Sequence, residues 1–192
     1  MEASLLRSDG TEAADVSFGD KNKKECYSPT YRQSYYKTFD KNGRLEIFVA
    51  GACPRHGLPG AKGGVGVWAG DGVRHPFNLS RRLNVGHQSR NRAKLMAAYE
   101  GLRLAKEMGS VMKVRLFTHS QLIYYGLRSY VYEWEENGWQ TDDHRPVENC
   151  DLWKSLLKIS RQFNECVIQY SPKNTLHGLR MAEKLARQGA NL

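Results

Sequence analysis

From residue 44 onward, apolar and polar positions alternate in two different periods, which predict strands followed by alternating helices and strands. Strands are expected at 44–53, 63–70, 74–83, 113–120 and 166–172. The Asp71-Gly72 step between the second and third is a hairpin signal. Helices are expected over 89–109, in short pieces within 121–139, and over 148–163 and 179–190.

The longest of these helices has apolar residues such as Ala93, Leu95, Leu102 and Ala105 at helical spacing, and Ser89 precedes it as a candidate N-cap. Three strands joined by short turns, followed by strands that alternate with helices, predict an α/β fold with a mixed sheet and helices on its faces.

Residues 1–40 show neither period. The segment 7–25 is dominated by small, polar and charged residues, which is typical of a disordered chain. A tyrosine cluster follows it, formed by Tyr27, Tyr31, Tyr35 and Tyr36. We therefore expect two parts, a flexible N-terminal leader over 1–40 that carries the tyrosines and a folded domain over 41–192.

Charge is distributed unevenly between these two parts. The 192-residue chain has a formal net charge of +9, and all of the excess lies in residues 41–192. A basic domain is attracted to nucleic acid or to another polyanion, although the same excess also serves solubility.

The four cysteines are scattered and form no CxxC pair, so neither a zinc site nor a disulfide framework is expected. No apolar run is long enough to cross a bilayer, and no apolar segment typical of a secretory signal opens the chain. Reduced thiols in the nucleus or cytoplasm, with no membrane partner, are the expectation.

The domain resembles a ribonuclease H of the type 1, or cellular, class. The resemblance is carried by a series of motifs in one order: GGVGVW, the NRA step that opens the long helix, LFTHS, YEWEENGW, PVEN and GLRMAEKLARQGA. It implies a ribonuclease H-like fold, with a five-stranded mixed sheet whose first three strands are antiparallel, flanked by helices on both faces.

The resemblance also implies where catalytic residues would lie. Members of this family place four carboxylates around two divalent metal ions, which stabilise the attacking and leaving oxygens. In this chain the four matching positions hold Ala50, Lys94, His119 and Glu183. Because one carboxylate of four is present and a lysine replaces another, we expect no metal ion, no cofactor and no catalytic residue, and Lys94 could pair with Glu183.

Positions that contact nucleic acid in the family are partly retained. They hold residues able to contact phosphates, sugars or bases, namely His87, Ser89, Arg90, Tyr130, Trp134 and Asn149. The two aromatic residues could instead be packing residues. The protrusion that is usually rich in lysine is acidic here, with Glu133, Glu135 and Glu136, and Asn174 is the nearest match to a histidine of the last loop.

These observations lead to a pseudo-enzyme as the first hypothesis, a catalytically inactive ribonuclease H-like protein that serves as a protein-interaction scaffold. The alternative is a binder of RNA/DNA hybrid or double-stranded RNA that does not cleave. A lesser alternative is an active ribonuclease H with an altered metal site.

Overall fold

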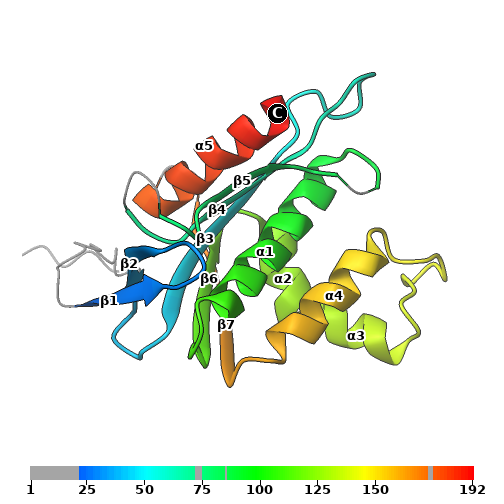
Figure 1. The fold of residues 1–192 in the computed structure, drawn as a ribbon. Helices are drawn as coiled ribbons and strands as arrows, with labels where there is room; N and C mark the ends of the chain where they lie inside the picture. The colour runs from blue at the N-terminus through cyan, green and yellow to red at the C-terminus, as the bar shows by residue number, and fades with distance from the viewer. Residues whose placement is uncertain (1–21, 72–74, 85, 173–174) are drawn as a thin grey trace, which may run out of the picture.

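A five-stranded mixed sheet forms the centre of the computed structural model, which describes residues 22–71, 75–84, 86–172 and 175–192 (Figure 1). Its strands are β3 (Leu45–Ala52), β4 (Gly64–Trp68), β5 (Leu79–Arg82), β6 (Lys113–Thr118) and β7 (Glu165–Tyr170). They lie in the order β5-β4-β3-β6-β7. The pairs β3–β4 and β4–β5 are antiparallel, whereas β3–β6 and β6–β7 are parallel. The predicted fold class is confirmed.

Helices cover both faces of this sheet (Figure 1). They are α1 (Arg90–Glu107), α2 (Gln121–Tyr125), a π-helical turn η2 (Gly126–Tyr130), α3 (Val131–Glu136), α4 (Cys150–Ser160) and α5 (His177–Asn191). Helix α5 packs on β3, β4 and β5, and α1 packs on the other face of β3 and β4, with α4 against it. Within the described part of the chain, no helix is both long and apolar enough to span a membrane.

The central strand β3 serves both faces. Leu45, Ile47 and Val49 lie in the larger hydrophobic cluster with α1 and α4. Phe48 and Ala50 lie in a smaller cluster beneath α5. Successive side chains of a strand point to opposite faces, so an almost fully apolar strand is what a sheet buried on both sides requires.

Helix α5 rests directly on the backbone of β4. A Cβ atom added at Gly66 would lie 2.1 Å from the carbonyl oxygen of Ala182, and one at Gly64 would lie 1.9 Å from that of Ala186. The glycines of the GGVGVW motif therefore allow the helix to approach the sheet more closely than any side chain would permit.

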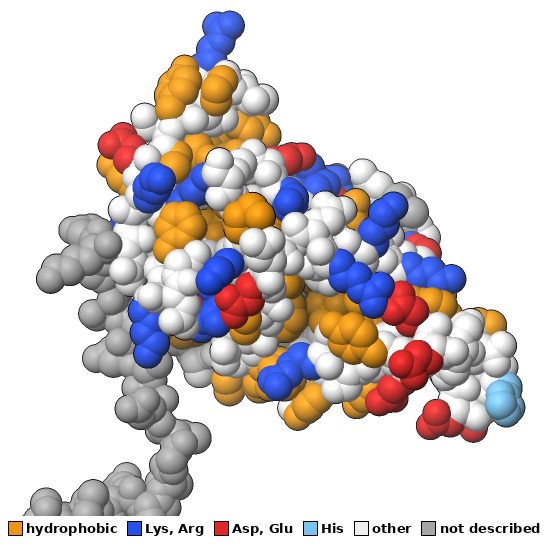
Figure 2. Space-filling view, turned by 90° about the horizontal axis from the view of Figure 1, so that it is seen from below, with side chains coloured by type: hydrophobic (Ala, Val, Ile, Leu, Met, Phe, Trp, Pro, Cys, Tyr) orange, Lys and Arg blue, Asp and Glu red, His pale blue; other side chains and the backbone are white. Residues whose placement is uncertain are grey.

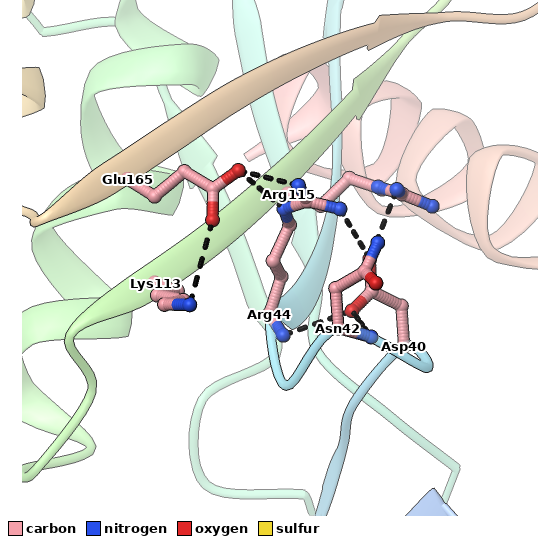
Figure 3. Close-up of polar contacts among 6 residues, drawn as sticks. All are labelled: Asp40, Asn42, Arg44, Lys113, Arg115 and Glu165. Carbon is pink, nitrogen blue, oxygen red and sulfur yellow. Dashed lines mark hydrogen bonds and ion pairs between the residues drawn. The ribbon is translucent and has the colours of Figure 1, made fainter.

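An ionic network joins β3, β6 and β7 at the end of the sheet where these three strands begin (Figure 3). Arg44 contacts both Asp40 and Glu165, and Arg115 contacts Asp40 at 2.9 Å. Burial alone would raise the pKa of the Asp40 carboxyl. Hydrogen bonds from the backbone N–H groups of Arg44 and Asn42, together with the charge of Arg115, outweigh that effect and hold the pKa of Asp40 below its usual value. The network ties three parallel strands together at the end remote from Ala52.

Residues that the sequence analysis assigned to the leader form a β-hairpin, β1 (Lys23–Ser28) and β2 (Gln33–Thr38). Tyr35 and Lys37 are buried, and the Lys37 ammonium donates to the carbonyl oxygens of Met108 at 2.7 Å and Gly109 at 2.9 Å. A cation at the C-terminus of α1 is favoured by the helix dipole. These contacts are long-range, so the local sequence pattern did not indicate them. The rest of the leader, 1–21, lies outside the described residues, and the domain boundary at 40 stays a prediction.

Replacing Gly66 by alanine is expected to destabilise the domain, because the new methyl group would displace α5 from β4. Overpacking of this kind costs about 1–3 kcal/mol. Urea denaturation measures the change in the free energy of unfolding. Ser34→Thr, which adds a methyl group at an exposed position of β2, is the matched control and should change it little. Equal stability of Gly66→Ala and the wild type would contradict the close approach of α5.

Candidate nucleic-acid interface

An open cleft of about 530 Å³ lies where β3 ends. Four elements line it: the end of β3 and the following turn, α1, the residue after β6, and α5. The lining residues are Gly51, Ala52, Cys53, Pro54, Arg90, Lys94, His119, Glu183 and Arg187. Three of the four positions that the family resemblance indicated are thus brought together here from distant parts of the chain.

Two close helix contacts set the walls of the cleft. On one side, a Cβ atom added at Gly51 would lie 2.2 Å from the backbone nitrogen of Lys94, so α1 meets the end of β3 at backbone distance and places Lys94 on the wall. On the other side, Ala50 is buried in the cluster that contains Ala182 and Ala186 of α5. The Ala50 methyl group is therefore part of the packing that places Glu183 on the opposite wall.

The cleft carries more positive than negative charge. Arg90, Lys94 and Arg187 supply three cations, and Glu183 is the carboxylate among the lining residues. The Arg187 guanidinium lies 3.4 Å from the Glu183 carboxylate. An ion pair between Lys94 and Glu183 stays a prediction, although both line this cleft. Such a surface attracts an anion at the end of β3.

The donor set does not fit the pair of divalent metal ions that the resemblance implies. Mg²⁺ binds oxygen ligands, and the four family positions offer one carboxylate, one methyl group, one imidazole and one ammonium. Among the residues that the structure describes, no group of three or more His, Cys, Asp or Glu side chains could hold a metal ion. No metal-dependent step follows from these residues.

Ser89 and Asn149, expected to contact phosphates, make internal hydrogen bonds. The Ser89 hydroxyl caps α1 by accepting the Arg92 backbone N–H at 3.1 Å, as the sequence analysis expected of an N-cap. The buried Arg92 guanidinium donates to Asn149 Oδ1 at 3.1 Å and to both carboxylate oxygens of Asp151. The hydrogen bond from Arg92 holds the pKa of Asp151 below its usual value. Arg92 thus joins the start of α1 to the start of α4.

The two predicted aromatic residues differ in exposure. Trp134 is partly buried, and its ring centroid lies 5.5 Å from that of Trp153 and 6.5 Å from that of Trp139. Tyr130 is 42% exposed, and its ring lies 5.7 Å from Trp134. Packing accounts for Trp134, whereas Tyr130 presents a ring on which a sugar or base could stack.

His87, three residues before α1, and Arg90, the first residue of α1, are both exposed, and Arg90 lines the cleft. Asn174 lies outside the described residues. Arg187, which lines the cleft from α5, was not among the predicted site residues. Its signal was present in the spacing of Arg180, Glu183, Lys184 and Arg187, since residues three, four and seven apart share one side of a helix.

Comparison with known proteins supports the resemblance. A family model described as RNase H matches residues 42–191. Ribonuclease H1 of Mus musculus is 30% identical over 144 residues, which cover 75% of this chain and 49% of the mouse protein. This chain thus spans about half the length of that relative. Ribonuclease H of Stutzerimonas stutzeri strain A1501 is 33% identical over 149 residues, 76% of this chain and 90% of the relative.

Solved structures show the same fold. The foamy viral protease-reverse transcriptase in complex with RNA/DNA hybrid superposes with a TM-score of 0.61 at 19% sequence identity, over 76% of this chain and 20% of that chain.

The comparisons contradict the prediction that the chain is not an enzyme. Relatives that are 30–36% identical to it are named ribonuclease H. The prediction of a pseudo-enzyme from Ala50, Lys94, His119 and Glu183 is therefore wrong. Four positions describe only part of the groups that would meet a bound substrate, so their identity alone does not establish that activity is lost.

Replacing Arg92 by methionine is expected to destabilise the domain by about 1–3 kcal/mol, because the part-buried hydrogen bond from Arg92 to Asn149 is lost. The Asp151 carboxylate is 59% exposed and can be hydrated, which limits the cost. Chemical denaturation measures the effect. The control is Arg90→Met, an exposed position two residues earlier in the same helix, which should leave the free energy of unfolding nearly unchanged. Similar losses in both variants would contradict this role of Arg92.

Proposed function

This chain belongs to the RNase H family, and from that premise we propose that its cleft binds RNA/DNA hybrid through the sugar–phosphate backbone. The observation that carries the proposal is the cluster of Arg90, Lys94 and Arg187 around the end of β3. Phosphate contacts with Lys and Arg supply a large share of nucleic-acid affinity.

The start of α1 strengthens this anion site. Helix α1 is 18 residues long and begins at Arg90, with no acidic residue in its first turn. The N-terminus of a helix carries partial positive charge and favours a phosphate nearby. Arg90 and Lys94 add full charges on the same part of the helix, so the two effects act together.

Contacts to backbone and sugar recognise the shape of a helix rather than its sequence. The exposed Tyr130 ring and the exposed His87 side chain are further candidate contacts for a sugar or a phosphate. Double-stranded RNA has similar A-form geometry, so it is the competitor that a binding test must include. A protein-interaction role and a nuclear or cytoplasmic location stay predictions.

Fluorescence anisotropy with labelled hybrid, duplex RNA and duplex DNA tests the proposal. We expect the wild type to bind hybrid more tightly than duplex DNA. We expect Arg90→Glu to weaken hybrid binding by about tenfold or more, equally across sequences, because it replaces a phosphate contact by repulsion. Lys41→Glu, an equal charge change at an exposed turn on the opposite end of the sheet, is the matched control. Equal losses in both variants, or no binding by the wild type at low salt, would refute the proposal.

Hydrolysis of a bound hybrid is a separate readout on the same samples. The relatives are named for it, and we propose that cleavage in this cleft depends on Glu183, its lining carboxylate. Glu183→Gln should abolish cleavage on a denaturing gel while hybrid affinity is kept or raised, because a negative charge is removed. Glu136→Gln on α3 is the control. Undiminished cleavage by Glu183→Gln would place the chemistry elsewhere.

A further inference from the structure

A second basic surface adjoins the cleft on the outer side of α5. We call it the α5 surface, and its cations are Arg55, Lys62, Arg180 and Lys184, with Arg187 shared with the cleft. One shallow hollow runs along α5 past Arg180, Lys184 and Asn191, and another lies between the end of α5 and the turn that carries Arg55 and Lys62.

The hollows are continuous with the cleft. The α5 hollow shares Glu183 and Arg187 with it, and the turn hollow shares Pro54 with it. Asn191 lines both of the outer hollows. Glu183 is the carboxylate among the residues lining these three hollows, so a polyanion leaving the cleft on this side meets cations for the whole distance.

The spacing on α5 suits a nucleic-acid strand. Arg180, Lys184 and Arg187 lie four and three residues apart, on the exposed side of a helix whose Leu179, Ala182 and Ala186 face the sheet. Seven residues of helix span roughly 10 Å, which matches about three nucleotides of a strand at 3.4 Å each.

The opposite side of the domain has the reverse charge. The segment from Val131 to Asn149 contains six carboxylates and one cationic side chain, Arg145. Figure 2 shows these acidic side chains gathered at the end of the molecule formed by α3 and the loop after it. Arg145 already pairs with Asp143, and Arg161 pairs with Glu135. Phosphates are therefore repelled from α3 and attracted towards α5.

We propose that the nucleic acid held in the cleft continues over the α5 surface, where Lys62, Lys184, Arg55 and Arg180 contact the backbone of one strand. This inference rests on the proposed function and gives it a direction. The bound duplex runs from the start of α1 across the cleft and along α5, away from α3.

The test compares the affinities of the 192-residue chain for a short and a long hybrid, of about 6 and 18 base pairs. The short one fills the cleft, and the long one also reaches the α5 surface. The variant is Lys62→Gln/Lys184→Gln, which removes two exposed cations that do not line the cleft. The control is Lys41→Gln/Lys158→Gln, which removes two exposed cations elsewhere. Thermal unfolding verifies that each variant is folded.

We expect the variant to weaken binding of the long hybrid about tenfold and to reduce the slope of log affinity against log salt by about 2, one for each phosphate contact. Binding of the short hybrid should stay as in the wild type, and the control should bind both as the wild type does. Unchanged binding of the long hybrid by the variant, or an equal loss in the control, would overturn the inference.

The outcomes separate this inference from the proposed function. Wild-type binding of the short hybrid that Arg90→Glu weakens, combined with no effect of Lys62→Gln/Lys184→Gln, would keep the cleft and overturn the α5 surface. No effect of Arg90→Glu, combined with the expected loss in Lys62→Gln/Lys184→Gln, would keep the α5 surface and overturn the cleft. No binding of either hybrid by the wild type would overturn both.

Discussion

The architecture depends on the backbone-to-backbone approach of two helices to the central strands. Gly51 meets α1 at Lys94, and Gly64 and Gly66 meet α5 at Ala186 and Ala182. At none of the three is there room for a Cβ atom, so the helices are held at fixed positions on opposite faces of β3 and β4. The cleft at the end of β3 exists because these two helices flank it, and the same contacts fix the positions of its lining residues on α1 and α5.

The two ends of the sheet differ in charge balance. Where β3, β6 and β7 begin, Arg44, Arg115, Asp40 and Glu165 neutralise one another in a structural network (Figure 3). Where β3 ends, Arg90, Lys94 and Arg187 gather around one carboxylate and leave a surplus of positive charge. A surplus of like charge costs stability through repulsion, and a bound polyanion relieves it.

Several of the residues predicted to contact nucleic acid instead make contacts within the domain. Ser89 caps α1, Asn149 accepts from Arg92, and Trp134 packs on Trp153. Of the predicted contacts, His87, Arg90 and Tyr130 stay exposed. Together with the other cations of the cleft they suit recognition of backbone and shape more than of base edges. The acidic α3 side and the basic α5 side give this surface a direction that overall net charge alone does not reveal.

The sequence by itself determined the fold class, the succession of strands and helices along the chain from residue 44 and the N-cap of α1, because period, glycine placement and capping are local signals. It also identified Lys94, His119 and Glu183 as residues of one site through the motif series. Tertiary structure alone decided that the hairpin packs on the end of α1 through Lys37, and that Arg92 donates a hydrogen bond to Asn149. It also decided that four cations, Arg187, Lys184, Lys62 and Arg55, form one surface with the cleft. These residues lie far apart along the chain, and only the packing of α5 against β4 brings their charges together.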